Sequence, residues 1–62
     1  MDFETFLNKD ITVHTESHTY RGILVEVLHE AGILVFSQGV DDFYIVAEKV
    51  IAITAHGREY KE

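Results

Sequence analysis

From residue 11 onward, apolar residues fall into short runs rich in β-branched and aromatic side chains, separated by small or polar clusters. Such runs are typical of β-strands, and their spacing predicts five strands. The predicted strands cover residues 11–15, 18–28, 33–37, 43–46 and 50–54. Because the connections between them are short, we expect an antiparallel meander that closes into a small, strongly bent, SH3-like barrel.

Ahead of the strands, Phe3, Phe6 and Leu7 are spaced i, i+3 and i+4, while the charged residues fall elsewhere on the helical wheel. This spacing predicts a short amphipathic α-helix over residues 2–8, with Asp2 as its N-cap. We expect its apolar face to cover the core of the domain. The alternative is a helix that docks on a partner.

A single domain is expected over residues 1–55, followed by a polar, frayed tail at 56–62. Gly22 lies inside the longest predicted strand. A glycine at such a position usually marks a bulge or a sharp bend. We therefore expect this strand to bend so that it serves both halves of the barrel.

Three runs are apolar at every position, although a half-exposed strand should alternate apolar and polar residues. They are GILVF at 32–36, FYIV at 43–46 and VIAI at 50–53. The surplus indicates that outward faces are also covered, which so short a chain cannot achieve alone. No charge or proline protects the last two runs against strand addition. We expect a homo-oligomer, closed head to tail into a ring, whose interface is formed by Phe43, Tyr44, Ile45, Val46, Val50, Ile51 and Ile53.

Composition, size and net charge limit the class of protein and the partners that we expect. The 62 residues are 47% hydrophobic and 26% charged, which is globular composition, and there is no cysteine. So small a domain usually needs a metal or other subunits for stability. The net charge of −6 opposes non-specific binding to nucleic acid. Neither a membrane span nor a signal peptide is apparent, so we expect a cytoplasmic protein.

The order of elements, one helix and then five strands with the second long and bent, resembles the Sm-like superfamily, which includes the Sm and LSm proteins and the bacterial RNA chaperone Hfq. The helix end FLN at 6–8 is similar to that of Hfq, and YRGIL and FYIV are similar to small uncharacterised Sm-like proteins of Gram-positive bacteria and phages. The resemblance covers nearly the whole chain. It implies a ring in which the fourth strand of one subunit pairs with the fifth strand of the next. The motif positions are matched by Tyr20, Gly22, Leu24, Val27, Ile33, Leu34, Val35, Tyr44, Ile45, Val50 and Ile53.

The resemblance does not extend to the usual RNA-binding residues of the family. Sm proteins bind uridine with an Asp-x-x-x-Asn arrangement and an Arg-Gly pair, and here Leu28, Gly32, Val46 and Ala47 occupy those positions. Where Hfq has a Lys-His pair, this chain has Ala47 and Glu48. An acidic residue there would repel phosphate. The expected function is therefore a non-catalytic assembly module that binds itself and an unidentified protein or ligand.

RNA binding through another surface is the alternative. Aromatic side chains stack on bases and basic side chains approach phosphates, and the candidates are Tyr20, Arg21, Tyr44 and Lys49, with Phe43, His18 and Arg58 as further contacts. No nucleophile motif, carboxylate dyad or glycine-rich phosphate loop is apparent, so we expect neither an enzyme nor a cofactor.

The stretch HTESHTY at 14–20 places His14, Glu16 and His18 at alternate positions, as a metal site on a straight strand would require. We instead predict a two-residue turn at Glu16 and Ser17, which pairs His14 with Thr19 and turns the two histidines to opposite faces. A metal bound between subunits by His14 or His18 is the remaining alternative.

Overall fold

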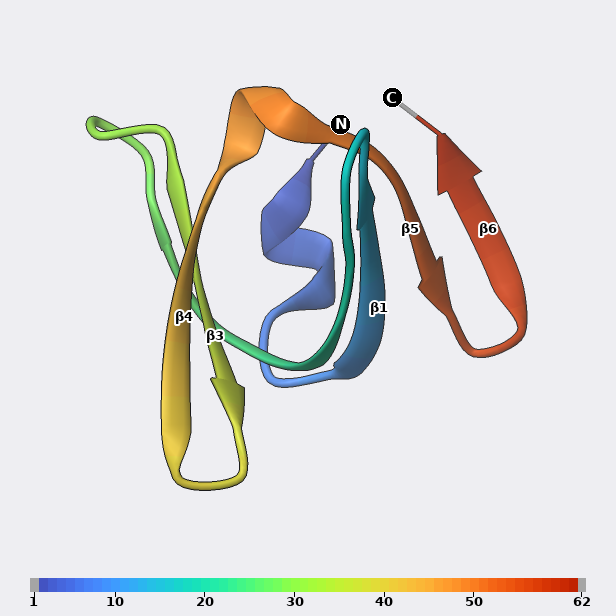
Figure 1. Ribbon diagram of the computed structural model, residues 1–62, viewed down its shortest axis with the longest axis horizontal. Coiled ribbons are helices and arrows are strands. Elements are labelled where there is room, and N and C mark those ends of the chain that lie inside the picture. The colour runs from blue at the N-terminus through green and yellow to red at the C-terminus, as the bar shows by residue number, and fades with distance from the viewer. Residues whose placement is uncertain (1, 62) are drawn as a thin grey trace.

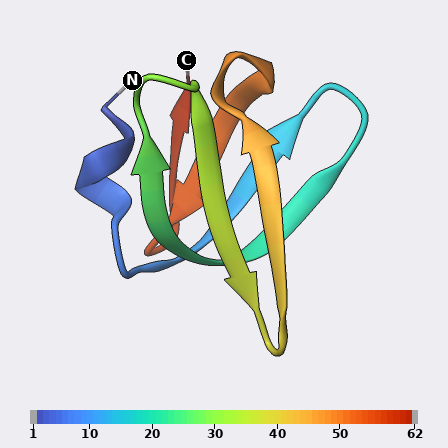
Figure 2. The same ribbon diagram turned by 90° about the vertical axis from the view of Figure 1, so that its left-hand side faces the viewer.

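The computed structural model describes residues 2–61, which form a six-stranded antiparallel sheet and two short 3₁₀ helices. The sheet order is β4-β3-β2-β1-β5-β6, so β4 and β6 are its edges. Figures 1 and 2 show the sheet bending around the core, with the β3–β4 hairpin on one side and the β5–β6 hairpin on the other. The elements are η1 (Phe3–Phe6), β1 (Asp10–Thr15), β2 (Thr19–Leu28), β3 (Ile33–Gln38), β4 (Asp41–Val46), η2 (Ala47–Lys49), β5 (Val50–Ala55) and β6 (Arg58–Lys61).

The mainly β class is confirmed, and all five predicted strands are present within two residues of their predicted bounds. Alternation along these strands directs every second side chain into one core. Leu24 of β2 lies opposite Phe36 of β3, and Leu34 of β3 lies opposite Ile45 of β4. The side chains with no exposed surface are those of Val13, Leu24, Leu34, Phe36 and Ile53. Burying a side chain of this size stabilises the fold by about 1.5–3 kcal/mol.

The predicted N-terminal α-helix over residues 2–8 is wrong. The chain forms only the four-residue 3₁₀ helix η1, with i to i+3 hydrogen bonds such as the one from the Leu7 N–H to the Glu4 carbonyl. Asn8 then adopts a φ of 64° and donates its N–H to the Leu24 carbonyl at 2.7 Å, which ends the helix. Asp2 caps η1 as predicted, since its carboxylate accepts from the Glu4 N–H at 3.2 Å.

Gly22 lies where the backbone of β2 passes close to the backbone of β3. A Cβ at this position would meet the Ser37 carbonyl oxygen at 2.6 Å, so only glycine allows the two strands to approach so closely. The irregularity in the β2–β3 register falls between Leu24 and Glu26, a few residues after the glycine. The predicted bend is therefore present, but its two parts, the close approach and the bulge, lie at different residues.

The expectation of a frayed tail at 56–62 is also wrong for the part that the structure describes. After a turn at His56 and Gly57, both with positive φ, the chain returns as β6 and pairs with Ala52–Ala55 of β5. Positive φ at both central residues is what a tight hairpin turn requires. The Tyr60 ring packs edge-on against Phe6, with centroids 5.1 Å apart. Met1 and Glu62, the ends of the predicted domain and tail, lie outside the described residues.

Candidate functional site

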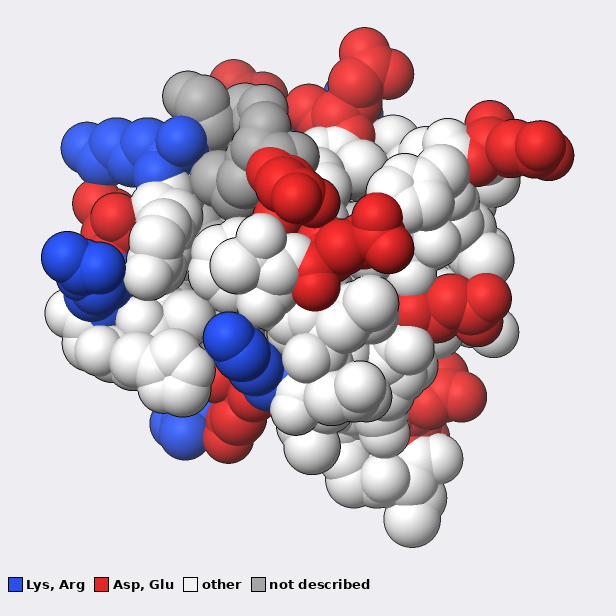
Figure 3. Space-filling model, turned by 180° about the vertical axis from the view of Figure 1, so that it is seen from behind, with Lys and Arg blue, Asp and Glu red and all other residues white. Residues whose placement is uncertain are grey.

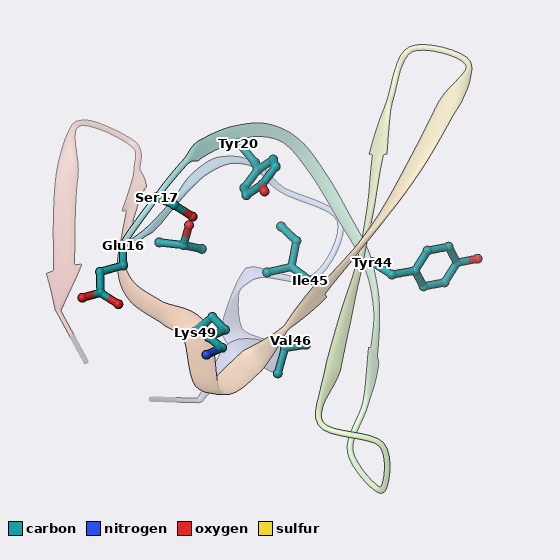
Figure 4. Close-up of a pocket in the computed structure, with 8 residues that line it drawn as sticks. Glu16, Ser17, Tyr20, Tyr44, Ile45, Val46 and Lys49 are labelled. Carbon is teal, nitrogen blue, oxygen red and sulfur yellow. The ribbon is translucent and has the colours of Figure 1, made fainter.

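A groove of about 550 Å³ separates the β1–β2 turn from β4 and η2 (Figure 4). One wall comes from the turn and the start of β2, and the other from the end of β4 and the following 3₁₀ helix. Its lining residues are Thr15, Glu16, Ser17, Tyr20, Tyr44, Ile45, Val46 and Lys49. The groove therefore has an apolar floor and a rim that carries one acidic and one basic side chain.

The turn wall is held by hydrogen bonds rather than by a favoured turn sequence. The Thr15 N–H donates to the His18 carbonyl at 2.8 Å, and the Thr15 hydroxyl donates to the same carbonyl and accepts from the His18 N–H. The His18 ring then stacks on Tyr20 at 5.8 Å, and Tyr20 lies 5.9 Å from Phe43. This row of aromatic rings connects the turn to β4, and its middle member, Tyr20, lines the groove.

The β4 wall of the groove is the backbone edge of β4 that is not paired with β3. Tyr44, Ile45 and Val46 are consecutive and all line the groove, although consecutive side chains of a strand point to opposite faces. What the three share is the backbone edge that β3 does not cover, because β4 is the last strand of the sheet. An edge of this kind presents unpaired N–H and C=O groups to any strand that approaches.

The outer face of β3 and β4 is apolar as well. Tyr44 is 68% exposed and Val46 is 47% exposed. Across the strand pair they lie opposite Val35, which is buried, and Ile33, which is half-buried. In Figure 3 the lower right region, over the β3–β4 hairpin, is mainly uncharged, whereas Lys and Arg gather at the left, toward the β5–β6 hairpin. The surplus of apolar residues seen in the sequence thus lies in part on an exposed face.

The seven predicted interface residues do not share one open edge. Phe43, Tyr44, Ile45 and Val46 do lie on the edge strand β4. Ile53 does not lie on a second open edge, because β5 pairs with β1 on one side and, over Ala52–Ala55, with β6 on the other. Val50 and Ile51 precede the stretch of β5 that β6 covers. Val50 and Ile53 are buried in the core, while Ile51 is 53% exposed. The head-to-tail pairing of β4 with β5 therefore lacks a free partner strand along Ala52–Ala55.

The candidate RNA contacts are likewise separated. Tyr20, Tyr44 and Lys49 line the groove, although the Tyr44 ring points away from it (Figure 4). Arg21 lies elsewhere and approaches Asp10, with 3.5 Å between Nε and Oδ1. No single surface of residues 2–61 unites the four side chains. Sequence reasoning missed the turn residues of the groove, although the predicted hairpin at Glu16 and Ser17 was the signal that could have located them.

The first hairpin has the register that the sequence predicted, with His14 opposite Thr19 and Val13 opposite Tyr20. His14 Nε2 lies 2.9 Å from the Thr54 hydroxyl, and His18 Nδ1 lies 3.0 Å from the Ser17 hydroxyl. The two histidines therefore have different partners. Within the described part of the chain, no group of three or more His, Asp or Glu side chains is placed to hold a metal ion.

Comparison with known proteins gives no relative: no family model, curated protein or solved structure matches the chain. Among residues 2–61, no helix is long and apolar enough to cross a membrane. The class that the fold and the groove define is a small antiparallel β-domain whose edge strand β4 is uncharged from Phe43 to Val46.

Proposed function

We propose that this chain is a non-catalytic, Sm-like assembly module, built as a small bent SH3-like barrel, that forms a homo-oligomer through an edge strand. The observation that carries the proposal is β4, an edge strand in which Phe43–Val46 contains no charge and no proline. Tyr44 and Val46 expose apolar surface beside it. Edges with these properties pair with other chains unless something covers them.

The order of elements supports the Sm-like assignment. A short helical segment precedes five strands, the second strand is the longest, and the 3₁₀ helix η2 connects the fourth strand to the fifth. The fifth strand returns to pair with the first, as the closure of a small barrel requires. The added strand β6 departs from the five-stranded pattern.

The mass in solution tests the proposal. We expect light scattering or sedimentation to give a multiple of the 7.1 kDa chain mass. Tyr44→Lys places a charge on the open edge strand, which discourages strand addition, and should shift the protein toward the monomer. Val40→Lys is the matched control, because it adds the same charge in a fully exposed turn next to β4. A wild-type monomer at all accessible concentrations would overturn the proposal.

RNA binding through another surface is the second candidate, and it has less support. The groove brings one stacking side chain, Tyr20, and one cation, Lys49, next to the acidic Glu16. Titration with short oligo-U and oligo-A distinguishes the candidates. We expect no binding tighter than micromolar, and tighter binding that weakens steeply with added salt would favour the RNA candidate instead.

A further inference from the structure

The two edges of the sheet differ in their chemistry, and this difference bears on how two copies meet. The edge strand β6 carries Arg58, Glu59 and Lys61, and its one apolar side chain, Tyr60, packs against Phe6. Charged side chains, lysine above all, are the usual protection of an edge strand against pairing. The edge strand β4 has no such protection after Asp42. The edge of β4, which is uncharged from Phe43 to Val46, is therefore the one suited to a second copy.

We infer that two copies of this chain associate symmetrically, with β4 of one copy pairing antiparallel with β4 of the other across a twofold axis. This inference rests on the proposed homo-oligomer and specifies its interface. A contact between two identical edges is isologous and closes at a dimer. It joins two sheets into one and leaves β6 of each copy at the outer ends.

Charge placement favours the antiparallel arrangement. Asp41 and Asp42 begin β4, and Val46 ends it, so Asp42 and Val46 are about 14 Å apart along an extended strand. In an antiparallel pair each acidic end lies beside the far end of the partner strand, away from the partner's own acidic end. A parallel pair would place the four carboxylates side by side, which is destabilising.

The far end of β4 also offers a cation to that acidic end. Lys49 follows β4 in η2 and lines the groove beside the strand edge. Glu48 lies in the same turn but is not part of the groove lining, and the acidic side chain that does line the groove, Glu16, comes from the opposite wall, the β1–β2 turn. Asp41 and Asp42 of one copy would thus approach the Lys49 side of the groove of the other. The same geometry extends the apolar face of Tyr44 and Val46 from one sheet to the next.

Single cysteines test the symmetry directly, because the natural chain contains none. In a twofold strand pair, one position lies opposite itself, with Cβ atoms about 4.5–5.5 Å apart, close enough for a disulfide. The variants are Asp42→Cys, Tyr44→Cys and Val46→Cys, which share the outer face of β4, each oxidised mildly and analysed without reductant. Lys61→Cys, on the exposed face of β6, is the matched control.

We expect at least one β4 variant to form a covalent dimer about tenfold faster than Lys61→Cys, because strand pairing holds its two sulfurs within disulfide range. A dimer that forms only when Tyr44→Cys is mixed with Lys61→Cys would overturn the inference in favour of head-to-tail contact, while the proposed homo-oligomer would stand. An oligomer in which no β4 variant cross-links to itself, and in which Tyr44→Cys cross-links to neither Asp42→Cys nor Val46→Cys when the two are mixed, would also overturn it. A monomer by mass would overturn both.

Discussion

Replacement of Gly22 by alanine should weaken the contact between β2 and β3. The new Cβ would lie 2.6 Å from the Ser37 carbonyl oxygen, whereas ordinary carbon–oxygen contacts begin at about 3.3 Å. The two strands must therefore separate by about 0.7 Å. A backbone oxygen cannot rotate away as a flexible side chain would, so the strain falls on the strand pair. Gly22 has no positive φ, so alanine adds no torsional cost there.

The expected loss of stability follows from two opposed effects. Overpacking of this kind costs about 1–3 kcal/mol, while the reduced freedom of alanine in the unfolded chain returns about 0.4–1 kcal/mol. The net loss is about 1–2 kcal/mol. For a domain of this size, a loss of 1 kcal/mol lowers the Tm by about 4–8 °C, so Gly22→Ala should lower it by about 5–15 °C.

Thermal unfolding followed by far-UV circular dichroism measures this shift, with all variants at one protein concentration because association also raises the Tm. Gly39→Asn is the control: a Cβ at Gly39 meets nothing within 4 Å, and asparagine tolerates its φ of 63°. The control should stay within about 4 °C of the wild type. A Gly22→Ala variant as stable as the wild type would refute the close approach of β2 and β3.

Further predictions concern the C-terminal strand and the predicted sites. Tyr60→Ala removes the edge-on contact with Phe6 and should cost about 1–3 kcal/mol in chemical unfolding, whereas an equal effect of Glu59→Ala would show that the aromatic contact is unimportant. Ile51→Lys should leave the mass in solution unchanged, because the proposed interface is β4 and β6 covers β5 from Ala52 onward; conversion to monomer would restore β5 as the interface. Added zinc should not change the Tm, and a rise would indicate a metal site between subunits.

The strands were predictable because the sequence features that define each strand lie within the strand and its flanking residues. Each apolar run carries its own alternation and its own boundary, and the two-residue turn at Glu16 and Ser17 is enough to define the register of the first hairpin. The groove was not predictable in the same way. Its two walls are about thirty residues apart in the sequence, and only the bend of β2 brings the turn toward β4.

The failed predictions have local physical causes. The spacing of Phe3, Phe6 and Leu7 suits a helical face, but spacing alone does not distinguish two α-helical turns from one 3₁₀ turn that ends at a left-handed Asn8. The strand β6 was missed because its sequence, REYK, is polar. His56 and Gly57 were the available signal, since a residue that tolerates positive φ followed by glycine suits a two-residue hairpin turn.

That hairpin turn also bears on the proposed association of two copies. Without β6, the sheet would end in β4 on one side and β5 on the other, and two unlike apolar edges allow head-to-tail growth into rings or fibres. With β6 in place, one edge carries the charges of Arg58, Glu59 and Lys61, while the other, β4, is uncharged from Phe43 to Val46. When only one edge strand is open to pairing, its free backbone groups can pair only with the same strand of a second copy. The four-residue polar strand β6 thus favours a closed dimer over head-to-tail rings or fibres, although it leaves β4 itself unchanged.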